Sequence, residues 1–121
     1  PGIEVELRYE DVPTWLNRIY ANYDFDMNLN YFYQLPDPVL GVHRHYGTDQ
    51  IRQGTHFVNA SQYSNPALDA LLAAGAQEPD AAKRTEIYGE IQTILATDMP
   101  VANLFEMQFL TVHNDKLQNT E

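Results

Sequence analysis

The sequence predicts an α/β fold, because apolar residues alternate with polar ones in two stretches and follow helical spacing elsewhere. Residues 3–9 and 26–33 have the alternation typical of strands that bury one face. Residues 12–22 carry apolar side chains at helical intervals, and so do residues 66–74 and 81–97. A strand, a helix and a second strand within about thirty residues predict a right-handed βαβ unit with parallel strands.

The first strand and the helix after it are each marked by a clear pattern. In the strand, apolar and charged residues alternate without a break: Ile3, Glu4, Val5, Glu6, Leu7, Arg8 and Tyr9. Asp11 can cap the following helix, and Pro13 is tolerated in its first turn. Asp24 and Asp26 then turn the chain into the second strand, whose apolar residues are Met27, Leu29, Tyr31 and Tyr33.

Two further helix starts are marked by a capping residue followed by proline. Asp37 can cap a short helix that begins at Pro38 and ends near Gly47, and residues 48–62 have no clear period and are predicted to form a loop. Asn65 can cap the next helix, and Pro66 suits the first helical position because its missing N–H would have no partner there.

The last part of the chain is predicted to contain a long helix and two short strands. Gly75 is expected to end the helix at 66–74 in a left-handed conformation. The helix at 81–97 should pack against it, although Gly89 weakens its middle. Val101–Phe105 and Phe109–His113 are short apolar segments and are predicted to be strands.

Length and composition exclude several classes of protein. With 121 residues the chain can build one modest core. Seven basic residues against seventeen acidic ones give a net charge of −10, which argues against nucleic-acid binding because phosphates need positive partners. There is no cysteine, so disulfides and thiolate chemistry are excluded. The chain lacks a leader sequence and is interpreted as a fragment of a longer precursor.

No residue pattern indicates catalysis, a metal or a cofactor. His43 and His45 are two residues apart, which places them on different helix faces, and the other two histidines are isolated, so surface or packing roles are favoured over metal binding. Asp24 and Asp26 are better explained as turn residues than as paired catalytic carboxylates. No Ser–His–Asp pattern or glycine-rich phosphate loop is present, and the protein is predicted not to be an enzyme.

The tyrosine-rich stretch from Tyr31 to Pro38 is the best candidate for ligand contact. It follows the C-terminal end of a predicted strand, where open α/β sheets usually place ligands. Aromatic side chains there can contact a ligand, but packing in the core would explain the same residues.

An ordered set of motifs resembles the solute-binding proteins of ABC importers, in the class with dipeptide-, oligopeptide- and nickel-binding members. The set runs through Ile3–Leu7, Trp15–Tyr20, Asp24–Asp26, Pro36–Asp37–Pro38, Gly54, Phe57, Asn59, Tyr63–Ser64–Asn65–Pro66, Asp69, Leu71, Arg84, Tyr88, Asp98 and Pro100. The resemblance implies that residues 1–121 are part of the C-terminal lobe of a two-lobed, type II periplasmic-binding-protein-like fold. It also implies a monomer, periplasmic or extracytoplasmic and associated with the membrane, that passes a peptide or other small solute to an ABC permease.

The resemblance assigns the ligand-binding role to Tyr31, Tyr33, Gln34, Asp37 and Asn59. Tyr31 stands where peptide-binding members have a tryptophan, and Gln34 stands where they have an aspartate that pairs with the ligand's free amino terminus. A neutral glutamine cannot form that charge-assisted bond, although it can bond amides or hydroxyls. Sugars, modified peptides and other polar solutes therefore remain open as ligands.

Two other functions remain open. The first is a stand-alone interaction domain that binds a protein through its aromatic surface; a signal sequence and a preceding lobe in the parent gene would argue against it. The second is a piece of a hydrolase, which would need the fold to bring a nucleophile and a base together.

Overall fold

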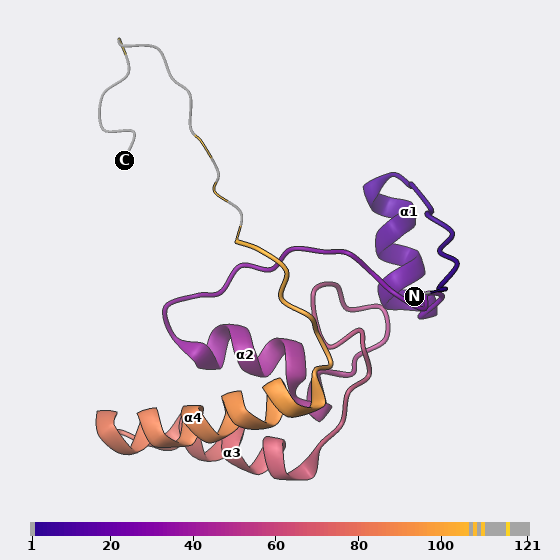
Figure 1. Ribbon diagram of the computed structural model, residues 1–121. Coiled ribbons are helices and arrows are strands. Elements are labelled where there is room, and N and C mark those ends of the chain that lie inside the picture. The colour runs from indigo at the N-terminus through magenta and orange to yellow at the C-terminus, as the bar shows by residue number, and fades with distance from the viewer. Residues whose placement is uncertain (1, 107, 109, 111–115, 117–121) are drawn as a thin grey trace.

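The computed structural model describes residues 2–106, 108, 110 and 116, and over these residues the secondary structure is entirely helical. Figure 1 shows α3 and α4 side by side with α2 against them, while α1 lies apart and is joined to them by long loops. The elements are α1 (Val12–Leu16), the π-helical turn η1 (Asn17–Asn22), α2 (Pro38–Tyr46), the 3₁₀ turn η2 (Thr48–Gln50), α3 (Pro66–Gln77) and α4 (Ala81–Asp98).

The prediction of an α/β lobe, and with it a type II binding-protein fold, is wrong for the described residues. Residues 3–9 and 26–33 are extended or irregular but pair in no sheet, and Val101–Phe105 is not a strand either. The predicted strand Phe109–His113 lies largely outside the described residues.

The physical reason is clearest in the second of these stretches, where the polar side chains face the protein. The Trp15 indole donates to Asn28 Oδ1 at 3.0 Å, and the Asn30 amide donates to the Tyr20 hydroxyl at 3.1 Å. The alternation therefore turns the apolar side chains outward, and Leu29 is 75% exposed. A two-residue period shows which side chains share a face, but it does not show which face is buried.

The predicted helices near the N-terminus and at Pro38 are confirmed. Asp11 Oδ1 accepts from the Thr14 backbone N–H at 2.9 Å, and helical structure runs from Val12 to Asn22 as expected, with its second half π-helical. Asp37 Oδ1 accepts from the Val39 N–H at 3.0 Å, so it caps α2 as predicted.

The predicted pair of C-terminal helices is also confirmed. Asn65 Oδ1 accepts from the first backbone N–H groups of α3, and Asp80 Oδ1 accepts from the Lys83 N–H at 2.9 Å at the start of α4. The expected cap at Gly75 is wrong, because α3 continues to Gln77 and Gly75 is buried inside it. A Cβ at Gly75 would lie 3.0 Å from the Tyr88 ring, so this glycine permits close approach of α4.

The interior consists of two separate apolar clusters. The smaller one packs Ile19 and Tyr20 of η1 against Val58 in the loop before α3. The larger one packs Leu68 and Leu72 of α3 against Ile91 of α4, with side chains from α2 around them. The larger cluster holds α2, α3 and α4 together and positions the site described next.

Candidate ligand-binding site

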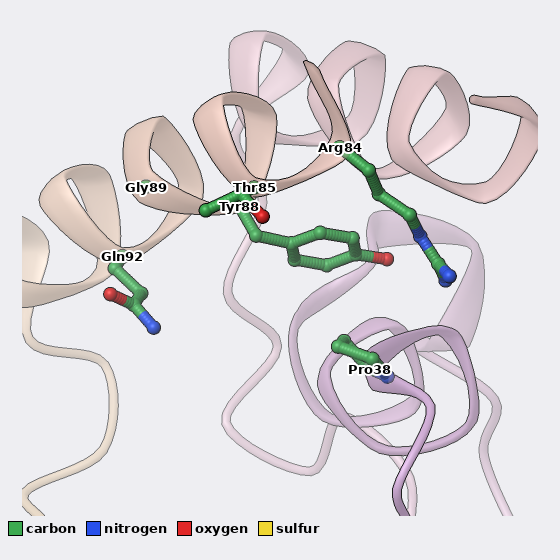
Figure 2. Close-up of a pocket in the computed structure, with 6 residues that line it drawn as sticks. All are labelled: Pro38, Arg84, Thr85, Tyr88, Gly89 and Gln92. Carbon is green, nitrogen blue, oxygen red and sulfur yellow. The ribbon is translucent and has the colours of Figure 1, made fainter. Parts of the chain in front are cut away.

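One face of α4 and the start of α2 border an open pocket of about 340 Å³. Arg84, Tyr88 and Gln92 follow each other at intervals of four residues, so the helix places them on one face. Figure 2 shows Tyr88 and Arg84 extending toward Pro38, with Gln92 farther along the helix. The complete lining is Pro38, Arg84, Thr85, Tyr88, Gly89 and Gln92.

Arg84 is the charged centre of this region and is held by three neighbours. Its Nη2 donates to Asp37 Oδ1 at 2.6 Å, and its Nε donates to the Gly75 carbonyl at 3.1 Å. Its guanidinium carbon also lies 5.6 Å from the centre of the Tyr88 ring, within the range of a cation–π contact. One side chain of α4 thus ties the start of α2 to α3.

Asp37 and Arg84 form an ion pair, and each partner favours the charged form of the other. The Val39 N–H and then the Arg84 guanidinium lower the pKa of the Asp37 carboxyl. The hydrogen bond to Asp37, and after it the nearby Tyr88 hydroxyl, raise the pKa of Arg84. The Tyr88 hydroxyl is itself buried and accepts or donates no hydrogen bond of standard geometry within the described part of the chain.

The pocket lining is partly polar and partly apolar. The Gln92 amide can donate and accept, and the Tyr88 ring offers an apolar wall. The Thr85 hydroxyl already donates to the Ala81 carbonyl at 2.8 Å, and Gly89 leaves open space beside it. The six lining residues include no histidine, cysteine or acid, so they supply no set of metal ligands.

The structure places two of the five predicted site residues, Asp37 and Gln34, against α2. Asp37 caps α2 and bonds Arg84 at the edge of the pocket. Gln34 lies over α2, where a Cβ at Gly41 would collide with its Oε1. The rings of Tyr31 and Tyr33 meet edge to face with centres 5.8 Å apart, and these residues are 52% and 60% exposed.

Asn59, the fifth predicted site residue, lies apart from the others in the loop before α3. It is 1% exposed, and its amide donates to the carbonyls of Gly47 at 3.0 Å and Tyr63 at 2.8 Å. Its Oδ1 accepts from Ser61 and from the Tyr63 N–H. These bonds give Asn59 a role in fixing the loop that leads into α3.

The sequence-based choice of site residues omitted the pocket on α4. The resemblance includes Arg84 and Tyr88 but implies no ligand-binding role for either, and it does not include Gln92. Their four-residue spacing was a usable signal, because it places three polar or aromatic groups on one helix face. Whether this face of α4 lies beside Pro38, however, depends on how α2 packs against α3 and α4.

His43 has a local partner, and His45 is buried. The His43 ring lies 2.8 Å from Asp49 Oδ1, and His45 is 4% exposed with its ring centre 3.9 Å from that of Phe32. Across the residues that the structure describes, no three potential metal-ligating side chains gather at one place.

Comparisons with family models, curated proteins and solved structures found no match. Among the described helices, none combines the length and apolar character needed to cross a bilayer.

Proposed function

We propose that this chain is part of the substrate-binding component of an ABC importer, which captures a peptide or other small polar solute outside the cytoplasm and delivers it to a membrane permease. The protein carries out no reaction in this role. Tyr31, Tyr33 and Gln34 contact the solute, and the Asp37–Arg84 pair holds the end of that stretch in place.

The observation that carries the proposal is that residues chosen for their resemblance to this family bond one another across the structure. Asp37 and Arg84 are 47 residues apart and form an ion pair at 2.6 Å. The Tyr63 hydroxyl donates to Asp98 at 2.5 Å, 35 residues away, and the Asn65 amide donates to the same carboxylate at 3.1 Å.

The ligand class follows from the groups around the tyrosine stretch. Two exposed aromatic rings favour a ligand with apolar or planar surface, and the Gln34 amide favours amide or hydroxyl groups. Gln34 cannot pair with an ammonium group as an aspartate would. The proposed solute is therefore a polar molecule whose free amino group, where it has one, does not determine binding.

The test uses the longest naturally encoded protein that contains these 121 residues. Thermal unfolding is followed with dipeptides, longer peptides, their acetylated forms and simple sugars. One class should raise the melting temperature as its concentration rises, because a ligand that binds only the native state stabilises it. If none of these classes does so at millimolar concentration, the proposal is wrong.

Two variants then locate the contact surface. Tyr33→Ala should weaken the binding of the stabilising solute, and Gln92→Ala tests the α4 pocket separately. Glu86→Gln, on an exposed part of α4 away from the pocket, controls for general effects of substitution. If only Gln92→Ala weakened binding, the solute would contact the α4 pocket and not the tyrosine stretch.

A second function is favoured by the apolar surface beside the tyrosines. Met27, Leu29, Leu35 and Leu40 are all exposed on the stretch that leads into α2 or on α2 itself. Such a surface also suits an interaction domain that binds another protein. A parent gene without a signal sequence or a preceding lobe, together with the absence of any stabilising solute, would favour this second function.

A further inference from the structure

The segment Ile3–Tyr9 is an extended chain whose apolar side chains have no place in either core cluster. Ile3 is 77% exposed and Tyr9 is 88% exposed, and Val5 and Leu7 are also exposed. Within the described residues, no backbone hydrogen bond joins this segment to another part of the chain. Figure 1 shows it as the indigo trace beside α1, at the opposite end from α3 and α4.

We propose that this segment is an interaction surface for a second copy of the chain, and that two copies pair antiparallel with Glu6 opposite Glu6. In this register every apolar residue faces an apolar residue, because Ile3 lies opposite Tyr9 and Val5 opposite Leu7. On the other face each Glu4 lies opposite an Arg8 of the other copy, twice by symmetry. Opposite charges in directly facing positions stabilise a strand pair.

Charge complementarity selects this register over the alternatives. A parallel, in-register pair would place Glu4 opposite Glu4 and Arg8 opposite Arg8, which is unfavourable. A shift of one residue would set apolar side chains opposite charged ones. A shift that placed Leu7 opposite Leu7 would pair Glu6 with Arg8, but it would also bring Glu4 against Glu10 and leave Ile3 without an apolar partner.

Two features keep the proposed dimer weak. The facing Glu6 pair and the net charge of −10 on each copy both oppose association. The contact is also one short strand per copy, which places it below stable interfaces in size. The dimer is therefore expected to form reversibly as protein concentration rises, and it departs from the monomer expected from the resemblance.

Sedimentation equilibrium over a range of concentrations measures the dimerisation of the 121-residue chain. The same measurement on charge-reversed variants tests the proposed register. Glu4→Arg and Arg8→Glu should each weaken the dimer by about tenfold or more, because each turns two attractive pairs into repulsive ones. A mixture of these two variants should associate again, since each arginine in one variant then faces a glutamate in the other. The double variant, with both substitutions in one chain, should also dimerise.

Matched controls change the same charge elsewhere. Glu86→Arg and Lys83→Glu alter exposed positions on α4 and should leave the dimer as in the unmodified chain, after allowance for net charge. Glu6→Gln should tighten the dimer because it removes the central repulsion. Circular dichroism of each variant confirms that the helices persist, which is needed because Arg8 also lies 3.6 Å from Glu6 and 3.8 Å from Asp24.

The proposal is overturned by any of the following results. The unmodified chain stays monomeric at the highest concentration measured, or both single variants associate as the unmodified chain does, or their mixture fails to associate. A stronger dimer with Glu4→Arg would also overturn it, because that result belongs to the register that places Glu4 against Glu10.

Discussion

At the scale of single residues, His45 is the clearest case of a polar group held in an apolar place. Its Nε2 is buried and has no hydrogen-bond partner among the described residues, and its ring packs on Phe32. Burial, and after it the positive charge of Arg44, lowers the pKa of His45 to about 4. The ring is thus neutral in the folded protein at pH 7, and protonation must compete with folding.

His45 should make the folded state less stable in acid. Its pKa is about 6.5 in the unfolded chain, so the stability that depends on neutral His45 is complete above pH 6.5 and is lost as the pH falls toward 4. The expected loss is about 2 kcal/mol between pH 6.5 and 5, at about 1.4 kcal/mol per pH unit. Urea unfolding of the unmodified chain and of His45→Phe across this range measures it as a difference. Parallel pH profiles for the two proteins would contradict the prediction.

Gln34 is the residue through which the proposed ligand class can be tested. In the longest natural protein containing this chain, Gln34→Asp should raise affinity for unblocked peptides by about ten- to hundredfold, because a charge-assisted hydrogen bond contributes about 1.5–3 kcal/mol. Acetylated peptides should gain nothing. Calorimetric titration of matched free and acetylated peptides measures the difference. If the unmodified protein already prefers the free amine strongly, another acid makes that pair and the assignment of Gln34 is wrong.

At the scale of elements, the α3–α4 pair shows how similar residues acquire different roles. Gly75 lies where the two helices touch, and a Cβ there would meet Ile87 at 3.3 Å and Tyr88 at 3.0 Å. Gly89 lies on the exposed side of α4 with nothing within 4 Å of the same position. The first glycine is needed for packing, whereas the second only weakens a helix.

Leucine substitutions at the two glycines should therefore act in opposite directions. Gly75→Leu should destabilise the protein by about 1–3 kcal/mol, because the added side chain overpacks the contact with α4. Gly89→Leu should stabilise it by about 0.5–1 kcal/mol through helix propensity. Chemical denaturation of both variants provides the measurement, and each serves as the control for the other. Equal effects would show that the α3–α4 contact is looser than described.

At the scale of the whole molecule, order is concentrated around the larger apolar cluster. Leu68, Leu72 and Ile91 are almost fully buried, whereas residues 3–9 lie outside both clusters. Regions with few buried contacts and few backbone hydrogen bonds open at low cost in free energy. The molecule should therefore divide into a protected helical part and an unprotected extended part.

Amide hydrogen exchange in dilute solution should show this division. Peptides from α3 and α4 should exchange slowly, and peptides covering residues 3–9 should exchange within the shortest labelling time, because their N–H groups have no backbone partner in the described structure. Mass spectrometry at several labelling times makes the comparison. Slow exchange of residues 3–9 in dilute solution would mean that the segment pairs within the chain after all. Protection that appears only at high concentration would instead belong to the proposed dimer.

The sequence by itself determined the helices, because their signals are local. Asp11, Asp37 and Asn65 cap the helices that follow them, and a cap acts on backbone groups only two or three residues away. The apolar face of α3 was equally readable, with Leu68 and Leu72 on one side. Of the candidate site, the sequence indicated Asp37 and the tyrosine stretch, whereas Arg84, Tyr88 and Gln92 were left out.

Features that depend on residues far apart in the sequence, such as strand pairing and the Asp37–Arg84 ion pair, were decided only by the tertiary structure. A strand needs hydrogen bonds from another strand. The alternation in residues 3–9 and 26–33 is compatible with strands, but it does not show whether a partner strand lies beside either segment. The outward direction of Leu29 followed from bonds that Asn28 and Asn30 make to the first helical region. The pairing of Asp37 with Arg84, 47 residues apart, likewise followed from the packing of α2 beside α4, which no local pattern specifies.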